Sequence, residues 1–142
     1  MAYTAKRSTA ATKAAIEAMG ALLNSGKLRI YSGTQPTDAN TAFNEHADEV
    51  LLAELTFNAS AFGTATAGVI TAAAITADSD ADATGTAAWF RCLKSGGTDV
   101  TDNVYDGSVG TTGCDLNLNT VSIVQHASVS VTSLTLTAVA AE

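Results

Sequence analysis

Apolar positions in the first 26 residues recur with the period of a helix. Between Ser8 or Thr9 and Asn24, one helical face would carry Thr12, Ala15, Ile16, Met19, Leu22 and Leu23. Ser8 or Thr9 can cap the start, and Gly26 can end the helix in the left-handed conformation. The pattern therefore predicts a short amphipathic helix, with Lys13 and Glu17 as an i, i+4 ion pair.

After residue 26 the helical period gives way to short apolar and β-branched runs separated by turn formers. These runs predict strands at residues 27–33, 50–58, 68–76, 87–95, 99–107, 114–120, 121–125 and 128–139. In the last run, Val129 and Val131 would lie on one face of a regular strand and Leu134 and Leu136 on the other. An extra residue at Thr132 or Ser133 would bring them to the same face, which predicts a β-bulge or bend. Short strands at such spacing predict a mainly β protein: a jelly-roll-like β-sandwich with one short N-terminal α-helix.

The chain has 142 residues, enough for one folded unit with its own core. Within it, residues 1–26 form a basic arm and amphipathic helix, and residues 27–142 form the β-sandwich domain. Residues 33–49 form a connection too long for an ordinary turn, and loops of this length are more often functional or ordered by a partner than idle.

Charge is distributed unevenly. Residues 31–142 carry two basic and thirteen acidic residues, a net of −11. Residues 1–30 have a net charge of +4, with one acid and five basic residues: Lys6, Arg7, Lys13, Lys27 and Arg29. An acidic body disfavours a nucleic-acid partner, and its basic end either docks on an acidic protein surface or is only solvated. No apolar run is long enough to span a bilayer, so no membrane partner is expected.

Three aspartates alternate in "DSDADATG" (residues 78–85). Asp78, Asp80 and Asp82 resemble the first half of a calcium loop, but Ala83 stands where that loop needs glycine and Trp89 where it needs a bidentate glutamate. The three carboxylates are either a weak calcium site or, as we expect, a solvated turn between two strands. No metal or cofactor is expected.

Residues suited to catalysis are few and scattered. Either His46 or His126 could act as a general base, but neither lies in a recognisable motif. The stretch "GSVGTTG" (residues 107–113) lacks the strand-to-helix elbow of a serine hydrolase, and phosphate loops, zinc spacings and dinucleotide fingerprints are missing. We therefore expect no enzyme and assign no catalytic residues.

The apolar run "AAWFRCL" contains the chain's one tryptophan. Trp89 and Phe90 point to opposite faces of one strand; if both are buried, the strand is central or its outer face meets another subunit. Arg91, in phase with Trp89, is then a candidate for an interface ion pair. Cys92 is expected to be a buried hydrophobe, and Cys114 lies at a strand start; a disulfide between the two remains an alternative.

Several stretches between residues 27 and 137 carry a family resemblance: "RIYSGTQP", "LLAELTF", "GVIT", "TGTAAWFR" and "DLNLN" followed by "SVSVTSLTLT". In these the chain resembles small structural proteins of tailed bacteriophages, and within them the capsid cement, or decoration, proteins of the Bordetella-phage jelly-roll type. The motifs are structural rather than catalytic.

The resemblance implies a virion protein, assembled in the host cytoplasm, that binds the outside of the phage head and clamps neighbouring major capsid protein subunits. It also implies a homodimer. We expect Lys6, Arg7, Lys13, Lys27 and Arg29 to contact the capsid. Two alternatives stay open: a tail, neck or fibre structural protein, and a calcium- or carbohydrate-binding β module for host attachment.

Overall fold

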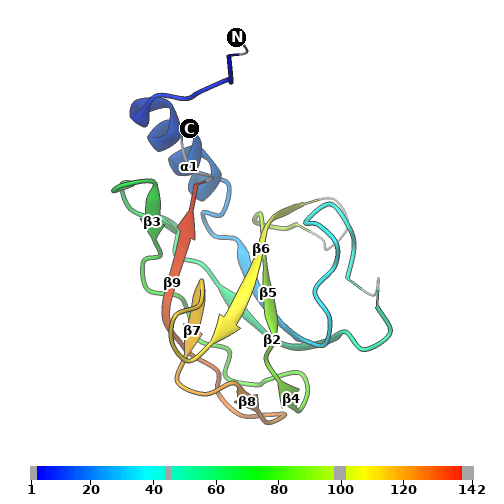
Figure 1. Ribbon diagram of the computed structural model, residues 1–142. Coiled ribbons are helices and arrows are strands. Elements are labelled where there is room, and N and C mark those ends of the chain that lie inside the picture. Colours follow the sequence, from blue (N-terminus) through cyan, green and yellow to red (C-terminus); the bar gives the residue numbers. More distant parts are fainter. Residues whose placement is uncertain (1–2, 44–45, 98–101, 139–142) are drawn as a thin grey trace.

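The computed structural model describes residues 3–43, 46–97 and 102–138 (Figure 1). It is mainly β, as predicted, and consistent with a β-sandwich. The helix is α1 (Thr9–Ala21), and the strands are β1 (Lys27–Ser32), β2 (Val50–Thr56), β3 (Val69–Thr71), β4 (Gly85–Thr86), β5 (Trp89–Leu93), β6 (Asn103–Gly110), β7 (Leu116–Leu118), β8 (Ser122–Ile123) and β9 (Val131–Thr137). The predicted strands 99–107 and 128–139 extend beyond the described residues, and the short β4 was not predicted.

The predicted helix is confirmed, including its start. The Ser8 side chain accepts a hydrogen bond from the Ala11 amide at 3.1 Å and so satisfies a free amide of the first turn. The predicted face is only partly right: Ile16 and Leu23 enter the core, whereas Ala15 and Leu22 are exposed.

The helix ends differently from the prediction. Ser25, with φ of 58°, adopts the left-handed conformation that was expected of Gly26. Gly26 is needed for a different reason, because a Cβ there would lie 2.2 Å from the Leu93 carbonyl oxygen. Close passage of the chain past β5, rather than a positive φ, therefore requires this glycine.

Within the described residues, seven strands form one sheet in the order β2-β1-β5-β6-β7-β9-β3, and β4 pairs with β8 separately. All pairs are antiparallel except β6 with β7. The core lies on the inner face, where Leu28, Ile30, Phe90 and Leu134 pack together. The jelly-roll form of the sandwich stays a prediction.

The segment after β3 connects the two ends of this sheet. Thr76 pairs with Thr56 of β2, whereas Asp78 pairs with Val129 just before β9. This segment divides its hydrogen bonds between two partners. It therefore does not form the single strand predicted at residues 68–76, of which only Val69–Thr71 is a strand. The open sheet thus curls around the core.

The bulge predicted in the last strand is confirmed. Asn117 of β7 pairs with Ser133, but Leu118 pairs with Val131, so Thr132 is the extra residue. The bulge restores the phase in which Leu134 and Leu136 are buried.

β5 is the central strand of its part of the sheet, with all five residues buried between β1 and β6. As predicted, Trp89 and Phe90 point to opposite faces: Phe90 and Cys92 belong to the core, and Trp89, Arg91 and Leu93 lie on the outer face.

Within the described residues, no helix is long and apolar enough to cross a membrane.

Candidate functional site

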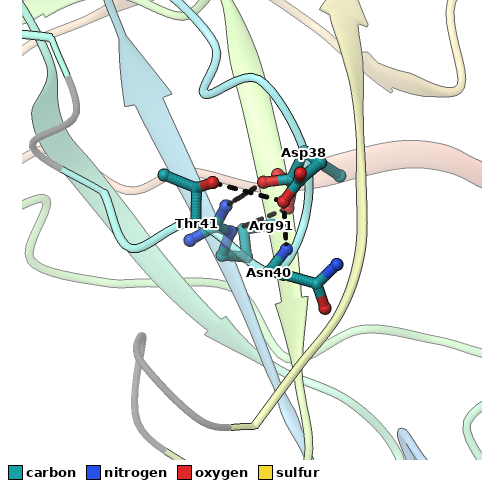
Figure 2. Close-up of polar contacts among 5 residues, drawn as sticks. Asp38, Asn40, Thr41 and Arg91 are labelled. Atoms are coloured by element: carbon teal, nitrogen blue, oxygen red, sulfur yellow. Dashed lines mark hydrogen bonds and ion pairs between the residues drawn. The ribbon is translucent and has the colours of Figure 1, made fainter.

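A buried arginine fastens the loop of residues 33–49 to the outer face of β5. The Arg91 guanidinium is fully buried and binds the Asp106 carboxylate of β6 through two hydrogen bonds of 2.7 Å. Its Nη2 also contacts the Asp38 carbonyl oxygen of the loop at 3.5 Å (Figure 2). The Asp38 side chain then orders the next turn, because its Oδ1 accepts hydrogen bonds from the Asn40 amide at 2.8 Å and the Thr41 hydroxyl at 3.2 Å.

This position of Arg91 corrects one prediction. Instead of an interface ion pair with another subunit, Arg91 forms an ion pair within its own chain. A carboxylate directly opposite on the neighbouring strand is nearer than any partner, since Arg91 and Asp106 are paired in register.

Aromatic side chains hold the same loop in place. The Tyr31 and Trp89 rings stack with centroids 4.3 Å apart, and Phe43 of the loop packs against Tyr31 at 5.4 Å. The Arg91 Cζ atom lies 5.4 Å from the centre of the Trp89 ring, within cation–π range. Loop, sheet and buried ion pair therefore form one packed cluster.

The two ends of the loop are tied to each other. The Thr34 hydroxyl donates to the Asp48 carboxylate at 2.9 Å, a bond that lowers the pKa of Asp48 below its ordinary value. Gly33 has φ of 85°, and a Cβ there would lie 2.2 Å from the Asp48 carbonyl oxygen. Between these ends, Gln35 and Asn40 are exposed. The loop thus presents a polar surface on a fixed frame.

The predicted capsid-contact residues fall into two groups. Lys27 and Arg29 lie on β1 beside Glu54 of β2, with Arg29 Nε 2.7 Å and Lys27 Nζ 3.8 Å from its carboxylate. Glu54 therefore compensates part of their positive charge within the sheet.

The other group lies at the helical end of the molecule. Lys13 pairs with Glu17 on α1, as the i, i+4 spacing predicted. Lys6 and Arg7 are exposed on the segment before the helix, which points away from the sheet in Figure 1. The five residues therefore do not form one patch.

Two of the three aspartates, Asp78 and Asp80, interact with neighbouring segments as well as with their own turn. Asp78 accepts hydrogen bonds from the amides of Glu54 and Asp80, each at 2.9 Å, and Asp80 lies 2.6 Å from His126 Nδ1. The Asp82 side chain is exposed, but partial desolvation, and then the charges of Asp78, Glu54 and Asp80, raise its pKa. Among the described residues, no three His, Cys, Asp or Glu side chains are placed to hold a metal ion.

The two histidines and the two cysteines lie in different environments. His46 lies in the loop, where its amide donates to Glu49 Oε1 at 3.2 Å, whereas His126 is an exposed turn residue with φ of 68°. Cys92 and Cys114 are free thiols. Cys92 is fully buried in the core, as predicted, and this burial raises the pKa of its thiol well above the ordinary value.

Sequence reasoning missed the cluster around Arg91 because its members come from four separated segments. One signal was available: a charged residue inside "AAWFRCL" must find an opposite charge if the strand is buried.

Compared with family models, with curated proteins and with solved structures, the chain matches none.

Proposed function

We propose that this protein is a virion structural protein, a capsid cement protein that binds the outside of a phage head and clamps neighbouring major capsid protein subunits. The observation that carries the proposal is the anchored loop of residues 33–49. The described residues of this long loop form no strand, and the loop is held by the buried Arg91 and by Phe43, which is the arrangement of a surface prepared for contact.

Prior ordering of a loop favours binding, because less conformational entropy is lost when the partner arrives. A protein that binds assembled subunits better than separated ones adds its binding free energy to the assembly. Repeated over many equivalent positions on a shell, a modest affinity at each is sufficient. Such a role needs a rigid surface and no reactive group.

The partners in this proposal are the major capsid protein and a second copy of the chain as a homodimer. The location is the exterior of the virion, after assembly in the host cytoplasm. The free thiols of Cys92 and Cys114 support assembly in a reducing compartment.

Two surfaces are assigned to the shell: the exposed residues of the loop, such as Gln35 and Asn40, and the basic segment of Lys6 and Arg7. We place Lys13, Lys27 and Arg29 second, because they are only partly exposed, whereas Lys6 and Arg7 are exposed.

The test is attachment of the purified chain to shells assembled from the major capsid protein encoded with it, measured by co-sedimentation and by electron microscopy. We expect Lys6→Glu with Arg7→Glu, and separately Gln35→Arg with Asn40→Arg, to reduce occupancy at least about tenfold, equivalent to about 1.4 kcal/mol. Lys94→Glu is the matched control, because Lys94 lies in neither surface and pairs with Asp102 at 3.3 Å.

The melting temperature of each variant must stay near that of the unchanged chain for the comparison to count. Absence of the chain from icosahedral positions, with density in a tail or neck ring instead, would replace the cement role by the alternative structural one. Full occupancy by both double variants would refute the two assigned surfaces.

A further inference from the structure

The large sheet is open between β6 and β9. β7, which lies between them, pairs with β6 only at Val109 and Gly110 and with β9 only up to Leu134. Figure 1 shows β6 and β9 both continuing past β7 toward α1. In the described part of the chain, residues 104–108 of β6 and residues 135–137 of β9 therefore have no partner strand on the sides that face β7.

Backbone groups of β6 point into this opening. The Val109 amide donates to the Ala88 carbonyl oxygen, just before β5, and in an antiparallel pair alternate residues bond to opposite sides. The amides and carbonyls of Asp106 and Ser108 therefore face away from β5. The Ser108 amide confirms this direction, since it contacts the Asp115 carboxylate at 3.5 Å. Residues 104–108 thus form an edge to which another strand can be added.

A groove of about 310 Å³ lies between this edge, β9 and α1. It is lined mostly by apolar side chains: Arg7, Ala15, Ile16, Met19, Tyr105, Thr137 and Ala138. Pockets for small ligands measure about 300–1,000 Å³, so this one suits one or two side chains of a strand. A carboxylate lies close by, because burial, and then the charge of Asp115, raises the pKa of Tyr105.

We propose that the N-terminal segment of a second copy, residues 3–7, adds a strand to the edge of β6 and places Tyr3 and Ala5 in the groove. In its own chain this segment forms neither helix nor strand, and Figure 1 shows it leading away from the sheet. Tyr3 is 92% exposed there. Five extended residues reach about 17 Å, which matches the length of residues 104–108 in β6.

The side chains of the segment match the groove. Alternate residues of a strand point to opposite faces, so Tyr3 and Ala5 lie against Met19 and Tyr105 while Lys6 stays on the other face, available for the shell contact assigned above. The positive segment also meets an acidic molecule, since residues 31–142 carry a net charge of −11.

The position of the groove allows the exchange to be mutual. Arg7 lines the groove of its own chain, so each N-terminal segment leaves its chain beside the groove that receives the segment of the second copy. Two identical chains related by a twofold axis then make the same contact twice. The inference rests on the homodimer of the proposed function but does not depend on the shell.

The test is the oligomeric state of the purified chain in the absence of shells. Tyr3→Ala removes the aromatic side chain of the segment, and Ala15→Arg blocks the groove. Ala18→Arg is the matched control, because Ala18 is exposed on α1 but does not line the groove. By sedimentation equilibrium we expect a dimer for the unchanged chain and the control, and a dissociation constant at least about tenfold higher for Tyr3→Ala and for Ala15→Arg.

Mixing the two weakened chains makes the assay specific to this contact. The Tyr3→Ala chain keeps its groove and the Ala15→Arg chain keeps its segment, so the mixture should form a heterodimer that is tighter than either chain alone. Since Tyr3 is 92% exposed, its replacement leaves the fold of the single chain intact.

A monomer at every concentration, a dimer that neither substitution weakens, or a mixture no tighter than its components would overturn the proposal. A monomer that still attaches to shells would refute this inference alone. A dimer that fails to attach to them would refute the cement role alone.

Discussion

The buried pair of Arg91 and Asp106 gives the sharpest prediction for stability. Replacing Asp106→Asn keeps the shape of the side chain but removes its charge, so the buried guanidinium loses its bidentate carboxylate. Arg91 is fully buried and the Asp106 side chain is 4% exposed, so water cannot replace the lost interaction.

The expected cost follows from this burial. Two unit charges 4 Å apart attract by about 4 kcal/mol at an effective dielectric constant of about 20. Breaking a buried pair by changing one member costs about 3–5 kcal/mol. We expect the lower figure, about 3 kcal/mol, because Arg91 keeps its contact with the Asp38 carbonyl.

Two comparisons make the measurement decisive. Glu54→Gln removes the partner of Arg29 in a pair that is 23% and 32% exposed, and we expect it to cost less than about 1 kcal/mol. Replacing both buried partners, Arg91→Met with Asp106→Leu, leaves no buried charge, so the free energy of unfolding should stay within about 1 kcal/mol of the original.

Urea unfolding followed by the fluorescence of Trp89 is the assay. Trp89 is the only tryptophan, and its ring stacks on Tyr31 close to Arg91, so it reports on this cluster. Far-ultraviolet circular dichroism should give the same midpoints. If Asp106→Asn costs no more than Glu54→Gln, the argument that Arg91 anchors the loop through a desolvated charge is wrong.

Two further predictions concern a glycine and an aspartate. Gly26→Ala should lower the free energy of unfolding by at least about 2 kcal/mol, because its Cβ would meet the Leu93 carbonyl oxygen, whereas Gly63→Ala, which meets nothing within 4 Å, should be neutral or slightly stabilising by thermal melting. If Gly26→Ala and Gly63→Ala changed the stability equally, the argument for close packing at Gly26 would be wrong. Asp82→Asn should raise the melting temperature at pH 7, since a raised pKa means that the ionised carboxylate is less stable in the folded protein than in the unfolded chain. This gain should shrink as the pH falls and vanish below the ordinary value of 3.8, because Asp82 is then protonated in both states, and a gain that is constant with pH would contradict it.

Local pattern was sufficient wherever neighbours in sequence decide the structure. The helix with its Ser8 cap, the Lys13–Glu17 pair and the bulge at Thr132 could all be predicted, because each depends on residues within a few positions. The burial of Cys92 was equally readable, because a small apolar residue in an apolar run belongs in a core.

Only the tertiary structure decided what Arg91 binds, what covers the outer face of β5 and why Gly26 is a glycine. Asp38 lies 53 residues before Arg91 and Asp106 lies 15 residues after it, and periodicity carries no information on which segments meet. A strand's pattern determines that both faces of β5 are buried, but long-range packing determines that a loop of the same chain does the burying. That is why the sequence predicted the β architecture and the candidate loop, but assigned Arg91 to the wrong partner.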